Sequence, residues 1–107
     1  MAWILLVLAG LFEVVWAFFM KKSEGFTLLL PSVVTIVTMI VSFVLLSIAM
    51  RTLPLGTAYT IWTGIGAVGA FAVGVLVLGD AATPMRLAAG ALIVAGIVLM
   101  KVSSPAA

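Results

Sequence analysis

Four long apolar runs account for nearly the whole of this 107-residue sequence, and they decide what kind of fold the chain can adopt. A helix needs about 17 to 25 predominantly apolar residues to cross the hydrocarbon core of a bilayer. Hydrophobic residues make up 66% of the chain and charged residues 7%, which leaves too little polar surface for a water-soluble domain. The sequence therefore predicts an all-α integral membrane protein.

Polar and helix-breaking residues divide the chain into four expected transmembrane spans. These cover about residues 3–20, 31–50, 56–78 and 85–101. The connections are only as long as neighbouring antiparallel helices require, and they contain turn-forming residues such as Gly25, Pro54 and Gly79. Residues 1–107 are thus expected to form a single transmembrane domain with both termini on one side of the membrane.

The composition argues against several classes of function. Cysteine and histidine are both absent, which removes disulfides, thiolate sites and the commonest metal ligand, so neither a metal nor a cofactor is expected. The five basic residues are spread among helix ends and suggest membrane anchoring, with nothing that indicates a nucleic-acid partner. Because the apolar run after Met1 lacks the form of a signal peptide, the first span is expected to remain in the protein.

The loop charges are nearly balanced across the membrane. Lys21, Lys22 and Arg86 fall on one side, whereas Arg51 and Lys101 fall on the other. An excess of Lys and Arg in short loops marks the cytoplasmic side, so this distribution gives little preference. It is compatible with insertion in both orientations.

Glu13, near the middle of the first span, is the principal candidate for a functional residue. A charged side chain there costs at least ~2.5 to 3.5 kcal/mol on insertion scales, and such residues usually mark an ion, proton or substrate site. Removal from water disfavours the charged carboxylate, whereas a bound cation favours it, so one acid can serve protons and cations. The alternative is a structural contact in which a Trp, Tyr or Ser donor satisfies Glu13.

The first span also places small and aromatic residues near this acid. Gly10 and Ala17 share the helical face of Glu13, with Trp16 beside them, and the small residues would let another helix approach closely. Trp16 could donate its indole N–H to the carboxylate and present its ring face to a cation. It could equally be a packing residue.

Polar and aromatic residues recur at helical spacing on the second and third spans. Thr35, Thr38 and Ser42 form a thin polar stripe, in which Ser42 could orient the acid or bond a carbonyl of its own helix. Tyr59 and Trp62, followed by Thr63, could wall a cation site, although Tyr59 could instead belong to an interfacial aromatic belt.

Small residues on the last two spans indicate close helix packing. On the third span a bend at the glycines could act as a hinge, and the fourth span, which has no central polar residue, suggests an assembly surface. The residues concerned are Gly64, Gly66, Ala70 and Gly74 on the third span, and Gly90, Ala91, Ala95 and Gly96 on the fourth.

A chain of four spans leaves little interior to line a transport pathway, so it is expected to oligomerise. A dimer of opposite orientations would bring two Glu13 carboxylates near the midplane. It would also supply the inverted symmetry that alternating access commonly uses.

Three stretches of the sequence resemble the small multidrug resistance family, and the resemblance extends over essentially the entire chain. They are AGLFEVVWA at 9–17, SEGFT at 23–27 and LPLGTAYTIWTGIGA at 53–67. Trp16, three residues after the glutamate, resembles the guanidinium-exporter branch, since the multidrug branch typically has a small residue there. Lys22 and Thr60 depart from the pattern, in which tyrosine and alanine are common.

The resemblance implies a secondary active transporter, not an enzyme, in a bacterial-type plasma (inner) membrane. It implies an antiparallel, dual-topology homodimer that exchanges protons for guanidinium and small guanidinyl cations. Glu13 would be the shared site, surrounded by Trp16, Ser42, Tyr59 and Trp62, with Gly10, Thr38 and Thr63 in support and the Gly90–Gly96 segment in dimerisation.

Two other functions fit the same residues. A multidrug exporter of quaternary ammonium ions would use the same acid in a wider aromatic pocket. A non-transporting membrane partner subunit would use Glu13 only to bond neighbouring helices, and a partner of similar sequence would raise the related case of a heterodimer.

Overall fold

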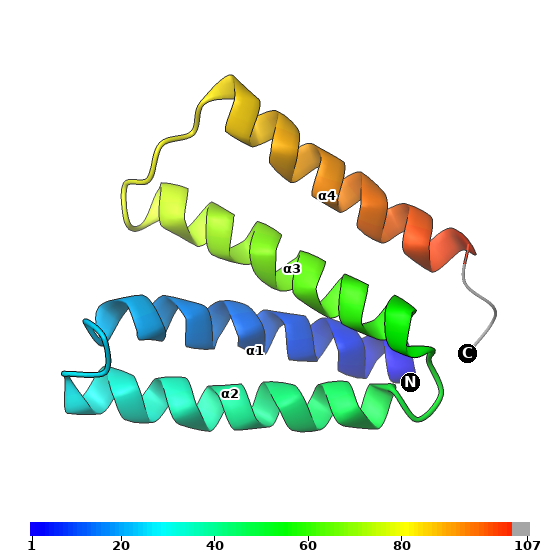
Figure 1. Ribbon diagram of the computed structural model, residues 1–107, viewed down its shortest axis with the longest axis horizontal. Helices are drawn as coiled ribbons and strands as arrows, with labels where there is room; N and C mark the ends of the chain where they lie inside the picture. The colour runs from blue at the N-terminus through cyan, green and yellow to red at the C-terminus, as the bar shows by residue number, and fades with distance from the viewer. Residues whose placement is uncertain (104–107) are drawn as a thin grey trace.

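The computed structural model describes residues 1–103; residues 104–107, in the tail predicted after the last span, lie outside the described residues. The described part contains no strand and forms α1 (Ala2–Lys22), α2 (Leu29–Ala49), α3 (Leu55–Leu76) and α4 (Pro84–Ser103) (Figure 1). All four helices are long and apolar enough to cross a membrane. The predicted all-α membrane fold with four spans is confirmed.

The helix ends differ from the predicted span limits by a few residues. α2 begins at Leu29, so Pro31 lies in its first turn, where a missing N–H needs no partner. α3 ends at Leu76 because the chain then folds back over its last turn. The backbone N–H groups of Leu78 and Asp80 both donate to the carbonyl of Gly74, at 3.1 and 2.9 Å.

The helices lie in a flat layer with principal extents of 42 × 34 × 16 Å. α1 and α2 run antiparallel and pack along each other, α3 packs mainly on α1, and α4 packs along α3 (Figure 1). The α1–α2 and α3–α4 connections lie at one end of the layer. The N-terminus, the α2–α3 connection and the end of α4 lie at the other.

The buried core is small and forms where α1, α2 and α3 meet. Its members are Leu6, Ala9, Leu46, Ala49, Leu53, Ala58, Ile61 and Trp62. The described residues of α4 include none that is buried. An apolar helix left uncovered in this way must face lipid or another subunit.

Buried Ser23 organises the short connection between α1 and α2. Its hydroxyl donates to the carbonyl of Met20 at 2.7 Å and accepts the N–H of Phe26 at 3.0 Å. The residues between, Glu24 and Gly25, have positive φ angles of 51° and 74°, and so does Phe26 at 66°. This left-handed turn leaves the Glu24 side chain exposed.

Candidate functional site

Glu13 lies midway along α1, and its side chain lies directly against the backbone of Gly66 on α3. Gly66 is buried, and a Cβ atom built on it would overlap the Glu13 carboxylate and come 2.7 Å from its Cγ. A larger residue at position 66 would force the Glu13 side chain to move. The small residue predicted as a packing or hinge position therefore forms one wall of the space around Glu13.

Two polar atoms on this part of α1 are buried without a hydrogen-bond partner among the described residues. They are Oε1 of Glu13 and Nε1 of Trp16, three positions apart on the helix. A buried polar group left unpaired costs about 1 to 3 kcal/mol, so such groups are rare and call for a partner. The alternative that the sequence allowed, a Trp, Tyr or Ser donor that satisfies Glu13, is therefore not formed at this oxygen within the part of the chain that the structure describes.

Ser42 connects three helices through hydrogen bonds. Its hydroxyl donates to the carbonyl of Ala9 on α1 at 2.7 Å and accepts the indole N–H of Trp62 on α3 at 2.9 Å. Ser42 therefore bonds neither Glu13 nor its own helix. Thr38 does bond its own helix, donating to the carbonyl of Val34 at 2.7 Å.

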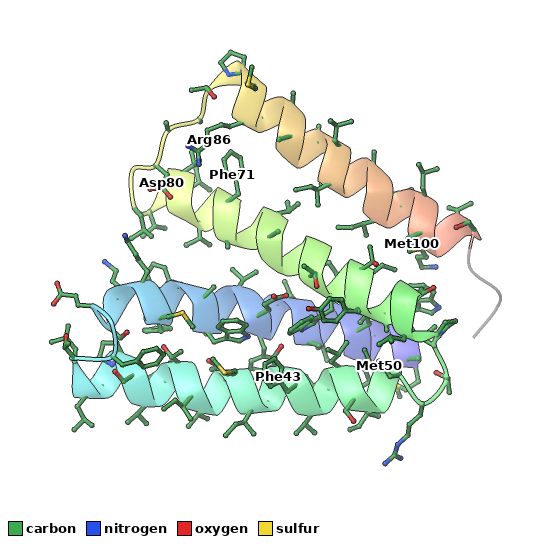
Figure 2. All side chains as sticks on the ribbon, in the orientation of Figure 1. Phe43, Met50, Phe71, Asp80, Arg86 and Met100 are labelled. Carbon is green, nitrogen blue, oxygen red and sulfur yellow. The ribbon has the colours of Figure 1, made fainter. Side chains whose placement is uncertain are left out.

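Aromatic rings from three helices form a continuous row, which we call the aromatic row: Trp16, Phe43, Trp62 and Tyr59. Successive ring centroids are 6.4, 5.7 and 5.6 Å apart. Phe43, near the middle of α2 in Figure 2, joins the two tryptophans and was not predicted from the sequence. Phe43 and Tyr59 remain 47% and 54% exposed, so parts of the row are open to a ligand or a second subunit.

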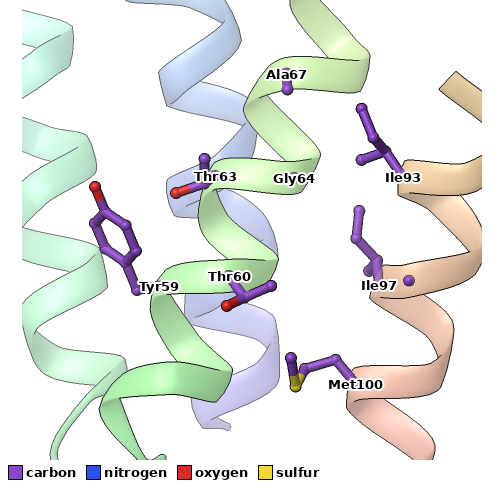
Figure 3. A pocket seen from close by; sticks show the side chains of 9 residues that line it. Tyr59, Thr60, Thr63, Gly64, Ala67, Ile93, Ile97 and Met100 are labelled. Carbon is purple, nitrogen blue, oxygen red and sulfur yellow. The ribbon is translucent and has the colours of Figure 1, made fainter. Parts of the chain in front are cut away.

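Thr63 lies in a different environment, a crevice between α3 and α4. It lines a cavity of about 490 Å³ together with Tyr59 and apolar residues of α4. Figure 3 shows Ile93, Ile97 and Met100 projecting from α4 on one side of this crevice, and Tyr59 and Thr63 on the far side of α3. The structure therefore places Tyr59 at the junction between the aromatic row and this crevice.

Two of the predicted glycines allow close helix packing within the subunit. A Cβ atom on Gly10 would come 2.6 Å from Cγ2 of Ile65, so Gly10 lets α3 approach α1. A Cβ atom on Gly64 would come 2.9 Å from Ile97, so Gly64 lets α4 approach α3. Both glycines thus act in packing between helices of one chain.

The small residues of α4 are largely uncovered. Ala91 and Ala95 are exposed, and a Cβ atom on Gly96 would meet no other atom within 4 Å. Gly90 is closer to its neighbours, since a Cβ atom there would lie 3.8 Å from ring atoms of Phe71. Ala91 and Ala95 are therefore open to another chain or to lipid, whereas Gly96 lines the crevice between α3 and α4.

Comparison with known proteins identifies the family. The family model described as Small Multidrug Resistance protein matches residues 1–94. Proteins named guanidinium exporter from Citrobacter freundii and Salmonella typhimurium are each 60% identical to this chain over 104 residues, which cover 97% of it and 99% of the relative. The guanidinium exporter of Escherichia coli (strain K12) is 59% identical with the same coverage.

Four membrane-spanning helices, together with these relatives, identify a multi-pass protein of the inner membrane. The family match covers α1, α2, α3 and the first half of α4, and so includes every residue of the aromatic row and Glu13. The chain belongs to the small multidrug resistance family.

Proposed function

We propose that this protein is a proton-coupled antiporter that exports guanidinium and small guanidinyl cations. Protons and substrate compete for two Glu13 carboxylates, which an antiparallel homodimer exposes to each side of the membrane in turn. The observation that carries the proposal is the buried Oε1 of Glu13, which has no hydrogen-bond partner among residues 1–103. An unpaired carboxylate oxygen in the middle of a membrane helix can bind a proton or accept a hydrogen bond from a cation.

The chemistry of the carboxylate suits this substrate. Guanidinium presents pairs of parallel N–H donors that match the two oxygens of a carboxylate. Bound guanidinium favours the charged acid, while a proton neutralises it, so each ligand excludes the other. Their mutual exclusion at Glu13 is the basis of exchange.

The aromatic row supplies a second element of recognition. Trp16 lies on the same helix as Glu13, and Phe43 connects its ring to that of Trp62. Aromatic faces attract cations, and tryptophan does so most strongly. The hydrogen bond from Trp62 to Ser42 holds one of these rings in place.

The shape of the subunit supports a dimer. A layer 16 Å thick cannot enclose a pathway lined on all sides, and α4 has an uncovered apolar surface with small residues. A second copy in the opposite orientation would cover the open side of Glu13 and generate inverted symmetry. The near balance of loop charges allows both orientations. In this arrangement the four spans work as one transmembrane domain.

The named relatives support both the substrate and the class of protein. At about 60% identity over nearly the full length, proteins called guanidinium exporters make guanidinium the leading substrate for this chain. They also favour a transporter over an enzyme. Trp16 also favours guanidinium as the substrate, because a large ring beside Glu13 narrows the space that a bulky quaternary ammonium ion would need.

A substrate panel tests the proposal. The purified protein is reconstituted in liposomes on a solid-supported membrane and challenged with guanidinium or tetrapropylammonium while transport currents are recorded. We expect saturable, pH-dependent currents with guanidinium and at least about tenfold weaker activity with tetrapropylammonium. Equal or stronger currents with tetrapropylammonium would favour a multidrug exporter, and no current with either cation would favour a non-transporting subunit.

A further inference from the structure

A second cavity, of about 240 Å³, lies between the ends of α1 and α3 and carries two opposite charges. Its lining includes Ala17 and Lys21 of α1, Ala70 of α3, and Asp80 of the α3–α4 connection. Neither Lys21 nor Asp80 has a role in the function proposed above. A cavity in which both a carboxylate and an ammonium group lie at one end of a membrane protein is suited to a small polar ion.

The backbone holds Asp80 in place at this cavity. Its N–H donates to the carbonyl of Gly74 at 2.9 Å, and Gly79, with φ +77°, makes the turn that folds the chain back. The Asp80 carboxylate lies directly against Gly74, where any side chain would overlap it. Figure 2 shows Asp80 beside the last turn of α3. The backbone of Asp80 is therefore fixed by the fold, whereas its side chain remains exposed.

The helix registers connect this cavity to Glu13. Residues four apart lie on the same face of a helix, so Glu13, Ala17 and Lys21 follow one another along α1. Gly66, Ala70 and Gly74 do the same along α3. Glu13 lies against Gly66, Ala17 and Ala70 line the cavity together, and Asp80 lies against Gly74. Small residues line these two faces between the acids over about 12 Å of helix, and Phe18 and Val73 also line the cavity.

The other basic groups at this end of the molecule are turned toward aromatic rings. The ammonium group of Lys22 lies 5.6 Å from the centre of Phe18, and the guanidinium of Arg86 lies 5.9 Å from that of Phe71. Lys21 is the basic residue that lines the cavity, and it does not form an ion pair with Asp80 among the described residues. The long Lys21 side chain can extend toward Asp80, or it can move out of the cavity and make room for a ligand.

We propose that Asp80 forms an outer binding site for a guanidinium-type cation, a vestibule on the route to Glu13, in which Lys21 is an internal competitor. This inference rests on the proposed function. A carboxylate in a cleft raises the local concentration of cations, and guanidinium can pair with it through two N–H donors. The nearby ammonium group opposes the same cation by repulsion and by occupying Asp80 itself.

Transport kinetics give the first test, through effects of opposite sign. Asp80→Asn should raise the guanidinium concentration for half-maximal current by about tenfold, whereas Lys21→Met should lower it by several-fold, with similar maximal currents. Glu24→Gln is the matched control, because Glu24 is a carboxylate at the same end of the molecule but does not line the cavity. It should change neither parameter.

Binding in a Glu13→Gln background gives the second test and separates the vestibule from the transport cycle. With Glu13 neutralised, guanidinium chloride should still shift the amide NMR signals of Gly79 and Asp80 beyond the effect of equal sodium chloride. Asp80→Asn should abolish that difference, while Glu24→Gln should preserve it. Retained dimer size in gel filtration shows that each variant is folded.

Several outcomes would overturn the vestibule. Asp80 binds no guanidinium if Asp80→Asn leaves the guanidinium concentration for half-maximal current unchanged. The same follows if guanidinium chloride shifts the amide NMR signals no more than sodium chloride does. Proton leak in both Asp80→Asn and Lys21→Met would instead indicate a structural gate. If wild-type currents are normal while these tests fail, only the vestibule is lost; if the wild-type protein gives no guanidinium current, the proposed function falls as well.

Discussion

The carboxylate of Glu13 on α1 lies so close to Gly66 on α3 that a single methyl group on Gly66 would overlap it. The crossing of α1 and α3 therefore leaves the Glu13 side chain its present place only because residue 66 has no side chain. The geometry of the candidate site thus depends on a residue that carries no functional group.

Gly66→Ala should therefore displace the acid and lower the guanidinium transport rate by about tenfold to a hundredfold, since small misplacements at reacting centres have effects of that size. Currents on solid-supported membranes measure the change. Gly56→Ala is the control. Gly56 lies on the same helix, but a Cβ atom there meets no atom of the described residues within 4 Å. Equal activity in both variants would show that the close approach has no functional role.

Ser42→Ala should destabilise the protein. The substitution leaves the buried indole N–H of Trp62 without its acceptor and removes an additional donor from the carbonyl of Ala9, at a cost of about 1 to 2 kcal/mol. Reversible unfolding in mixed detergent measures the free energy of unfolding. Thr38→Val should change it by less than about 0.5 kcal/mol, because Thr38 bonds only carbonyls of its own helix.

The bond between Ser42 and Trp62 predicts a coupling between their substitutions. Trp62→Phe keeps an aromatic ring but removes the N–H donor, so the loss from Ser42→Ala should shrink in its presence. A double-mutant cycle on unfolding free energies should give a coupling of about 0.5 to 1 kcal/mol. Strict additivity would mean that the bond contributes nothing to stability.

Trp16→Gly should widen the substrate range. Removing this ring opens space beside Glu13 and takes away the contact with Phe43. We expect the ratio of tetrapropylammonium to guanidinium current to rise by about tenfold or more. Trp3→Gly, at the start of the same helix, changes a tryptophan remote from Glu13 and should leave the ratio unchanged.

Ala95→Ile should weaken dimer formation if α4 is an assembly surface. Ala95 is exposed on α4, so the subunit itself leaves room for the larger side chain. Chemical cross-linking in liposomes should show a dimer population several-fold lower than in the wild type. Gly56→Ile, at a glycine where a Cβ atom has open space, reports any general effect of added bulk. An undiminished dimer in Ala95→Ile would place the interface elsewhere.

The sequence predicted the number and approximate position of the helices because bilayer thickness fixes how long an apolar run must be. Insertion cost similarly makes Glu13 the candidate acid, and helical spacing predicts Trp16 beside it. These inferences use only distances along one helix. They needed no knowledge of how the helices cross.

Features that depend on the rotation and crossing of helices could not be predicted. Ser42 has its donor and acceptor partners on two other helices, although a bond within its own helix was the simpler expectation. Phe43 could not be distinguished from the other apolar residues of its span by sequence, yet its ring connects the two tryptophans. Thr63 follows Trp62 in sequence but lies at the edge of the crevice between α3 and α4, because neighbouring positions on a helix point about 100° apart.

Proton movement driven by a guanidinium gradient, in wild type and in Glu13→Gln, tests the central claim most directly. The protein is reconstituted in liposomes that contain a pH-sensitive dye, with Glu24→Gln as a control for loss of a carboxylate outside the membrane. We predict a guanidinium-dependent pH change in the wild type and in Glu24→Gln, and none in Glu13→Gln. Coupled exchange that persists in Glu13→Gln would contradict the account.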